Sequence, residues 1–204
     1  MTTRERIMQV AERLVAEHGV DAVSVRDIIT AANANTAAIH YHFGSKLGLL
    51  EAILQRRAED VRSRREYYLG ELETNGAPCL RDVVAAFVQP TAEFADDEAK
   101  GDSHYLGFLA AILGHAEYMP LVLETFEEGT DRYLAVLSKV TPHLTPDVRE
   151  LRWALARDIT NRLIGDRNGP VQAWLGGRAP RSKQALTERL IDFLVGAFAA
   201  PATA

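Results

Sequence analysis

Residues 24–46 read S-V-R-D-I-I-T-A-A-N-A-N-T-A-A-I-H-Y-H-F-G-S-K, and this stretch decides the fold of the N-terminal part of the chain. Ser24 followed three positions later by Asp27 is typical of a capping box, which starts a helix. Apolar residues then recur at helical spacing. Asn33 stands where this helix must end, because asparagine tolerates the left-handed conformation found at helix ends. These signals predict a short helix followed by a tight turn.

A second helix is expected to begin just after Asn35, which is a further N-cap candidate. This helix is too short to be stable alone. Ile39 and Phe43 would face inward, which leaves an outward face of Thr36, Ala37, His40 and Tyr41. Two helices joined by a short turn form either a helix-turn-helix, whose second helix enters the DNA major groove, or an ordinary helical hairpin. Spacing alone does not choose between these two.

The first quarter of the chain resembles the DNA-binding domain of TetR-family transcriptional regulators. The resemblance rests on the opening helix R-E-R-I-M-Q-V-A-E-R-L-V-A-E-H-G, on the block S-V-R-D-I-I-T-A-A, and on I-H-Y-H-F-G-S-K with Leu49 and Leu50 after it. Asn33 and Ala34 depart from the usual glycine and larger aliphatic residue, and Leu47 replaces a frequent glutamate. The first two departures predict a slightly different turn, and none removes a phosphate-binding group.

The rest of the chain matches the family only in the number and length of its helices. We expect an all-α fold of about nine helices, with a three-helix helix-turn-helix domain at residues 1–46 and a larger ligand-binding and dimerisation domain at 47–204. Pro90 should kink or end one helix. Two stretches, 96–102 and 165–180, are expected to be loops. The helices are expected near residues 3–18, 24–32, 36–41, 46–75, 80–94, 104–117, 120–140, 146–166 and 182–199.

Composition is normal for a soluble globular protein, with 47% hydrophobic and 25% charged residues. The charge is unevenly distributed: residues 1–65 carry ten Lys or Arg against eight Asp or Glu, whereas the remainder carries thirteen against twenty. The positive part therefore coincides with the expected DNA-binding unit. Apolar runs are too short for a membrane span, no signal peptide is evident, and a single cysteine, Cys79, excludes an internal disulfide. We expect a cytoplasmic protein that binds no membrane.

The resemblance implies which residues would contact a double-stranded DNA operator. Backbone-holding candidates are Ser24, Asn35, Tyr41, His42 and Lys46, and base-facing candidates are Thr36, Ala37 and His40. A His40 side chain can donate to a guanine or accept from an amino group. Arg26 would face a phosphate or only solvent, and His42 has a structural alternative as the residue that closes the turn onto the next helix.

Residues 146–166 are apolar on two sides, and such a helix commonly buries one face in its own core and the other against a partner. Residues 182–199 are also broadly apolar. TetR-like chains usually pair these last two long helices in a four-helix bundle. We therefore expect a homodimer through 146–166 and 182–199, with two recognition helices about 34–36 Å apart on a nearly palindromic operator.

TetR-like proteins generally release DNA when a small-molecule inducer binds in the C-terminal domain, by a population shift that moves the long helix after Ser45. The alternative is that the apolar candidates are ordinary core and that Arg157 pairs with an acid. The candidate pocket residues are Phe87, Pro90, Tyr105, Phe108, Ile112, Phe126, Trp153, Arg157 and Asn161.

An enzyme is a poor fit to this sequence. It contains no H-E-x-x-H, no G-x-G-x-x-G and no P-loop, and the two histidines His104 and His115 are too far apart to form a close metal pair. We expect no catalytic residue, no metal and no cofactor. The expected function is a transcriptional regulator, most simply a repressor released by an inducer. The alternatives are an activator or a regulator without a small-molecule ligand.

Overall fold

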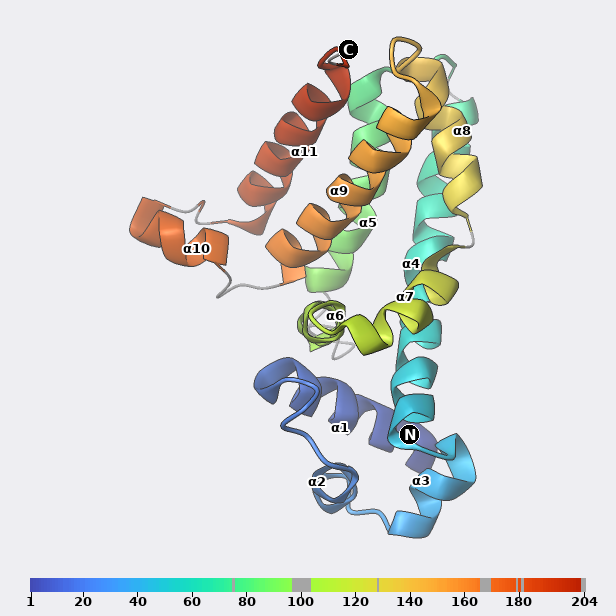
Figure 1. The fold of residues 1–204 in the computed structure, drawn as a ribbon, viewed down its shortest axis with the longest axis vertical. Helices are drawn as coiled ribbons and strands as arrows, with labels where there is room; N and C mark the ends of the chain where they lie inside the picture. The colour runs from blue at the N-terminus through green and yellow to red at the C-terminus, as the bar shows by residue number, and fades with distance from the viewer. Residues whose placement is uncertain are drawn as a thin grey trace. The chain divides into compact units, whose positions relative to one another are not determined.

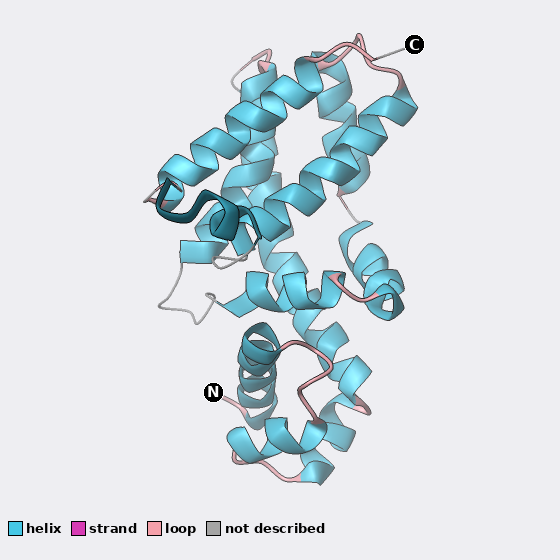
Figure 2. Cartoon of the chain, turned by 60° about the vertical axis from the view of Figure 1, so that its left-hand side comes forward, coloured by secondary structure: helices cyan, strands magenta, loops and turns pink. Residues whose placement is uncertain are grey.

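The computed structural model describes residues 1–74, 76–96, 104–127, 129–165, 170–178, 180 and 182–202. The secondary structure of these residues is entirely helical, as Figure 2 shows. Within the described ranges the chain forms eleven α-helices and two short 3-10 helices, so the expected all-α fold is confirmed. The α-helices are α1 (Thr3–His18), α2 (Val25–Ala31), α3 (Thr36–Phe43), α4 (Lys46–Thr74), α5 (Leu80–Asp96), α6 (Tyr105–Leu113), α7 (Met119–Glu127), α8 (Thr130–Val140), α9 (Pro146–Gly165), α10 (Pro170–Leu175) and α11 (Lys183–Ala199).

The chain divides into two compact units. Unit 1 comprises Met1–Asp60 and Ala95–Phe126, and unit 2 comprises Val61–Phe94 and Glu127–Ala204. Helix α4 contributes residues to both units (Figure 1). A division between a DNA-binding domain and a ligand-binding domain at residue 46 stays a prediction.

Unit 1 is built on α1, which contacts α2, α3 and α6. Helix α6 can lie close to α1 because Gly107 has no side chain: a Cβ there would lie 3.1 Å from the Cβ of Ala16. Behind the helix-turn-helix, the Arg57 guanidinium donates to both carboxylate oxygens of the buried Glu12, at 3.2 and 2.8 Å. Arg56 adds a third hydrogen bond at 3.1 Å. A buried carboxylate with this set of partners ties α1 firmly to α4, because removing a partner would leave an uncompensated charge.

Unit 2 has one apolar core, to which α4, α5, α8, α9 and α11 all contribute. Its centre is aromatic: the Trp153 ring lies 4.4 Å from Phe87 and 4.3 Å from Tyr133. The Tyr133 hydroxyl donates to the Val83 carbonyl, so this buried polar group is satisfied. On the surface, Arg81 of α5 forms ion pairs with Glu188 and Asp192 of α11.

The difference between nine expected helices and eleven observed ones lies at two places. The expected helix 120–140 is two helices, α7 and α8, separated near Gly129, whose φ of 86° is left-handed. The expected loop 165–180 contains α10, which begins at Pro170, and a 3-10 turn at Gly176–Arg178. Proline is favoured at the first position of a helix, and this signal could have revealed α10.

Two further expectations concern helix ends. Helix α5 does not end at Pro90 but continues to Asp96. The helix expected at 104–117 ends at Leu113 and is followed by a 3-10 turn, Ala116–Tyr118. The acidic loop expected at 96–102 lies, except for its first residue, outside the described residues.

Within the described ranges, no single helix has the length and apolar composition needed to cross a membrane. The segments Tyr105–Leu113 and Ala116–Thr125 satisfy length and composition only together, as a pair bent by 106°.

Candidate nucleic-acid interface

Side-chain caps fix the start of both helices of the helix-turn-helix. The Ser24 hydroxyl accepts from the Asp27 backbone N–H at 3.2 Å, and the Asp27 carboxylate accepts from the Ser24 N–H at 2.9 Å. The Asn35 side-chain oxygen accepts from the Ala38 N–H at 2.9 Å. Asn33 has a φ of 46°, which confirms the left-handed turn residue expected from the sequence. Local hydrogen bonds therefore define the short helix α3, which would be unstable alone.

The outward face of α3 is the one expected. Ile39 is buried, with 1% of its surface exposed, and Phe43 is half-buried. Thr36, Ala37, His40 and Tyr41 are exposed, and Tyr41 reaches 86%. An exposed tyrosine of this kind is unusual in a core-forming helix, but it suits a hydrogen bond to a phosphate.

A hydrogen bond orients the imidazole of His40. Its Nδ1 lies 3.1 Å from the Gly44 carbonyl oxygen, which can only accept, so Nδ1 carries the proton. In the neutral ring, Nε2 is then an acceptor. The sequence left two possibilities for His40, and this contact favours acceptance from an amino group over donation to a guanine.

The junction between α3 and α4 is unusually tight. A Cβ at Gly48 would lie 2.1 Å from the Phe43 carbonyl oxygen, which no real side chain could tolerate. The Ser45 hydroxyl caps α4 by accepting from the Gly48 N–H at 3.1 Å. The Lys46 ammonium donates to the Val20 carbonyl at 2.5 Å, so one of its three donors is already used. Sequence reasoning missed Gly48, because a glycine inside a helix gives no sign of what its missing side chain would meet.

The remaining candidates lie around this face. Ser24, Arg26 and Asn35 are exposed, and His42 is half-buried with its ring 5.0 Å from that of Tyr41. In the described part of the chain, no carboxylate forms an ion pair with Arg26. The Ser24 hydroxyl, followed by the Ser24 backbone N–H, lowers the pKa of Asp27, so this carboxylate stays charged at neutral pH.

The candidate ligand residues divide between the two units. Tyr105, Phe108 and Ile112 are buried on α6 in unit 1. In unit 2, Phe87, Pro90 and Trp153 are buried, and Arg157 and Asn161 are half-buried. The side chain of Phe126 lies outside the described residues. Phe87 and Trp153 are thus core residues in contact, whereas Arg157 forms no ion pair within the described ranges, contrary to the alternative in which it pairs with an acid.

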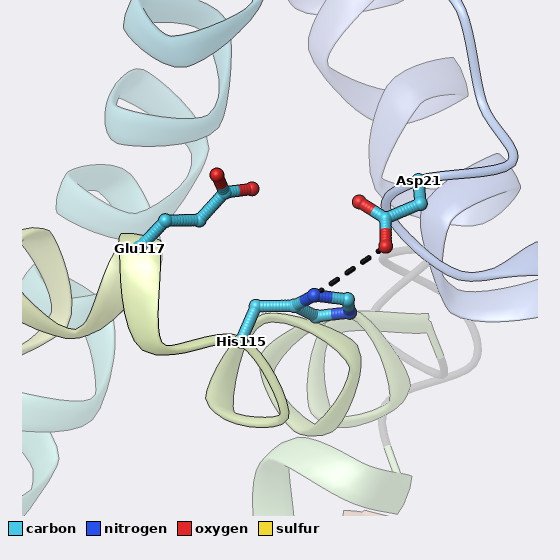
Figure 3. A group of neighbouring side chains, drawn as sticks. All are labelled: Asp21, His115 and Glu117. Carbon is cyan, nitrogen blue, oxygen red and sulfur yellow. Dashed lines mark ion pairs between the residues drawn. The ribbon is translucent and has the colours of Figure 1, made fainter.

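A group of potential metal ligands also lies in unit 1. Oxygen or nitrogen atoms of Asp21, His115 and Glu117 lie within 4.8 Å of one another (Figure 3). His115 Nδ1 is 3.4 Å from an Asp21 carboxylate oxygen, and both acids are exposed. Sequence spacing does not reveal this group, because Asp21, in the turn after α1, is distant in sequence from His115 and from Glu117 of the 3-10 turn. A surface ion pair accounts for the arrangement.

The sequence matches two family models. Residues 7–53 match bacterial regulatory proteins of the tetR family, and residues 85–197 match the tetracyclin repressor-like C-terminal domain. The HTH-type transcriptional regulator AcrR of Shigella flexneri is 27% identical over 89 residues, which are 44% of this chain and 41% of that protein. The HTH-type transcriptional repressor KstR2 of Rhodococcus jostii (strain RHA1) is 34% identical over 58 residues, 28% of each. The matches thus span less than half the length of these relatives.

Two solved structures share the fold. The TetR family transcriptional regulator PfmR from Thermus thermophilus aligns over 100% of both chains with a TM-score of 0.64 and 18% identity. The multidrug binding protein EbrR complexed with imidazole aligns over 100% of this chain and 98% of its own, with a TM-score of 0.56 and 19% identity. At such identities the likeness concerns the fold alone.

Proposed function

The chain belongs to the tetR family of bacterial regulatory proteins, and from this premise we propose that it is a repressor that binds a nearly palindromic operator as a homodimer and is released by a small molecule. It is a DNA-binding transcriptional regulator and not an enzyme. The observation that carries the proposal is the exposed polar face of α3, held outward by the buried Ile39 and by the caps on α2 and α3.

Each outward residue has a role that follows from its chemistry. Thr36 and Ala37 offer methyl groups that suit a thymine methyl, and His40 accepts from the amino group of an adenine or cytosine through Nε2. Tyr41 donates to a phosphate, as do Asn35, His42 and Lys46, and the exposed Arg26 adds a longer-range attraction. The Ser24 hydroxyl and backbone N–H both donate to the Asp27 carboxylate, so Ser24 would support DNA binding by capping α2 and not by a phosphate contact of its own. Bases read by His40 should therefore present an amino group rather than only acceptors.

Dimerisation would use the apolar surface that α9 and α11 leave uncovered in unit 2. Leu151 is 62% exposed, Leu155 53% and Phe193 60%. Large apolar residues gathered on adjacent helices mark an interaction surface. Phe198, in contrast, is only 2% exposed and belongs to the core of unit 2, so it would not contact a partner directly.

Release by a small molecule has support in the relatives as well as in the chain. EbrR is described as a multidrug binding protein and was solved with imidazole. Helix α4 contributes residues to both units, so one continuous helix connects unit 2, where a ligand would bind, to the helix-turn-helix. A repressor role is favoured by the name of KstR2, a transcriptional repressor.

The test is to select duplexes from a random pool with the full-length protein and to measure affinity for the selected site. Tyr41→Ala should weaken binding by about 1–3 kcal/mol, roughly 5- to 150-fold, while the dimer stays intact. Tyr67→Ala is the matched control, because Tyr67 is also exposed, at 56%, but lies on α4 in unit 2. Unchanged affinity of Tyr41→Ala, or selection of no palindromic site, would contradict the docking.

A further inference from the structure

Three polar residues share one face of α9 and have no hydrogen-bond or ion-pair partner within the described chain. Trp153, Arg157 and Thr160 are spaced four and three apart, which places them on the same side of a helix. Trp153 is 6% exposed and Thr160 is fully buried, and neither the Trp153 Nε1 nor the Thr160 Oγ1 has a hydrogen-bond partner. Buried polar groups are nearly always satisfied in native proteins, so two on one face require an explanation.

Thr160 differs from three other threonines, which lie at or near the C-terminal ends of α4, α7 and α8. In Thr74, Thr125 and Thr141 the hydroxyl donates a hydrogen bond to the carbonyl four residues earlier, at 2.8, 2.7 and 2.7 Å. This is the usual way in which a helical threonine satisfies itself. The Thr160 hydroxyl does not make this bond although it is fully buried, and so it remains available to another group.

Arg157 differs in the same way from four other arginines of unit 2. Arg81 and Arg132 form ion pairs with acids, Arg162 pairs with Asp158 at 2.8 Å, and Arg152 donates to backbone carbonyls at the end of α11. No such partner for Arg157 exists among the residues that the structure describes. Burial lowers the pKa of Arg157, because removal from water disfavours the charged guanidinium. An ordered water could satisfy the Trp153 or Thr160 group, but it could not neutralise a half-buried guanidinium.

The chemistry of the three groups defines what would complement them. The indole N–H and the guanidinium can only donate, and the hydroxyl can donate as well, so the complement is an acceptor with negative charge. One positive charge without an ion-pair partner among the described residues matches a monoanion, and a planar carboxylate matches the guanidinium geometry. The rings of Phe87 and Tyr133 pack against Trp153, so the immediate surroundings of the three groups are apolar.

We propose that this face of α9 binds the carboxylate of a small organic acid with an apolar body. The carboxylate accepts from Arg157, Trp153 and Thr160, and the apolar part lies against the aromatic centre of unit 2. This inference rests on the proposed function, because it names the chemical class of the small molecule that would release the operator.

The chain has two tryptophans, and they allow a direct measurement. Trp174 is 85% exposed, so Trp174→Phe leaves the buried Trp153 as the only fluorescent indole. The probes are 3-phenylpropanoate and octanoate, each compared with its neutral amide by fluorescence and calorimetry. We expect at least one acid to change the Trp153 emission and to bind about tenfold more tightly than its amide, a difference of about 1.4 kcal/mol.

Three variants in this background separate ligand binding from folding. Arg157→Gln should abolish the preference for the acid, whereas Arg162→Gln, an exposed arginine on the same helix, should keep it. Thr160→Val should have effects of opposite sign: it replaces an unsatisfied buried hydroxyl with a methyl group and so raises the melting temperature, while it weakens acid binding about 2- to 10-fold. A purely structural role for Thr160 would not produce this combination.

The outcomes distinguish this inference from the proposed function. Equal binding of acid and amide, a preference that survives Arg157→Gln, or the absence of any binding by both acids would overturn it. Operator affinity is measured separately. If an acid binds through Arg157 but leaves operator affinity unchanged, the site stands and release by this ligand is wrong; if only a neutral compound releases the operator, the proposed function stands and the carboxylate site is wrong.

Discussion

Helices α3 and α9 both present a face that the described chain does not cover, but the two faces have opposite chemistry. The face of α3 is short and carries Thr36, His40 and Tyr41 around a single buried anchor, Ile39. The face of α9 is long and carries Leu151 and Leu155. Exposed polar and aromatic groups such as these carry little free-energy cost in water and can bind a phosphate or a base edge. Exposed leucines are unfavourable in water, and covering them with another apolar surface lowers the free energy.

The two faces therefore require different kinds of partner. A polar face can remain in water until DNA arrives, so its contact can be reversible. An apolar face favours permanent cover, at about 25 cal/mol for each Å² removed from water. We therefore expect the α9 surface to be occupied continuously by a second copy and the α3 surface only when the operator is bound.

The largest effect is expected on self-association, when the exposed apolar surface of α9 and α11 is changed. Leu155→Glu combined with Phe193→Glu should weaken self-association by at least a thousandfold, about 4 kcal/mol, because each copy would bring two charges into an apolar contact. Analytical ultracentrifugation measures the association. Leu123→Glu is the control, since Leu123 is 56% exposed but lies on α7 in unit 1. A double variant that remains dimeric would place the partner surface elsewhere.

An intermediate effect is expected where α3 is joined to α4. Gly48→Ala should destabilise the protein by about 1–3 kcal/mol, because the new methyl group would meet the Phe43 carbonyl and displace α3. Gly70→Ala, in the same helix, has nothing within 4 Å and should stabilise the protein by about 0.5–1 kcal/mol. Urea denaturation compares the two. Equal effects of the two changes would show that α3 is not held as closely as described.

The smallest expected effect concerns the cap of α2. The pKa of Asp27 is lower in the folded chain than in the unfolded one, so its contribution to stability is complete above the unfolded pKa, about 3.9, and is lost as pH falls through the folded value. The melting temperature of the wild type should therefore exceed that of Asp27→Asn at neutral pH, and the difference should shrink on acidification. A difference that is constant with pH would exclude the charged cap.

Local signals explain why much of unit 1 could be predicted. The caps at Ser24 and Asn35, the left-handed Asn33 and the outward face of α3 each depend on residues within four positions of one another. Signals of the same kind existed at Gly129 and Pro170, where a helix break and a helix start were missed. At Pro90 the sequence left a kink or an end open, and the helix does not end there: α5 continues through this proline, which lies beside the buried Phe87 and Val88.

The helical class, the capped helix-turn-helix and the family can be predicted from the sequence, because they depend on neighbouring residues and on their order. Four other facts become known only from the folded chain: the side of α9 that enters the core, the contact of Glu12 with Arg57, the carbonyl that Gly48 faces, and the lack of an acid beside Arg157 among the described residues. Those facts depend on groups brought together from distant parts of the chain, and helical spacing gives the faces of a helix without saying what each face will meet.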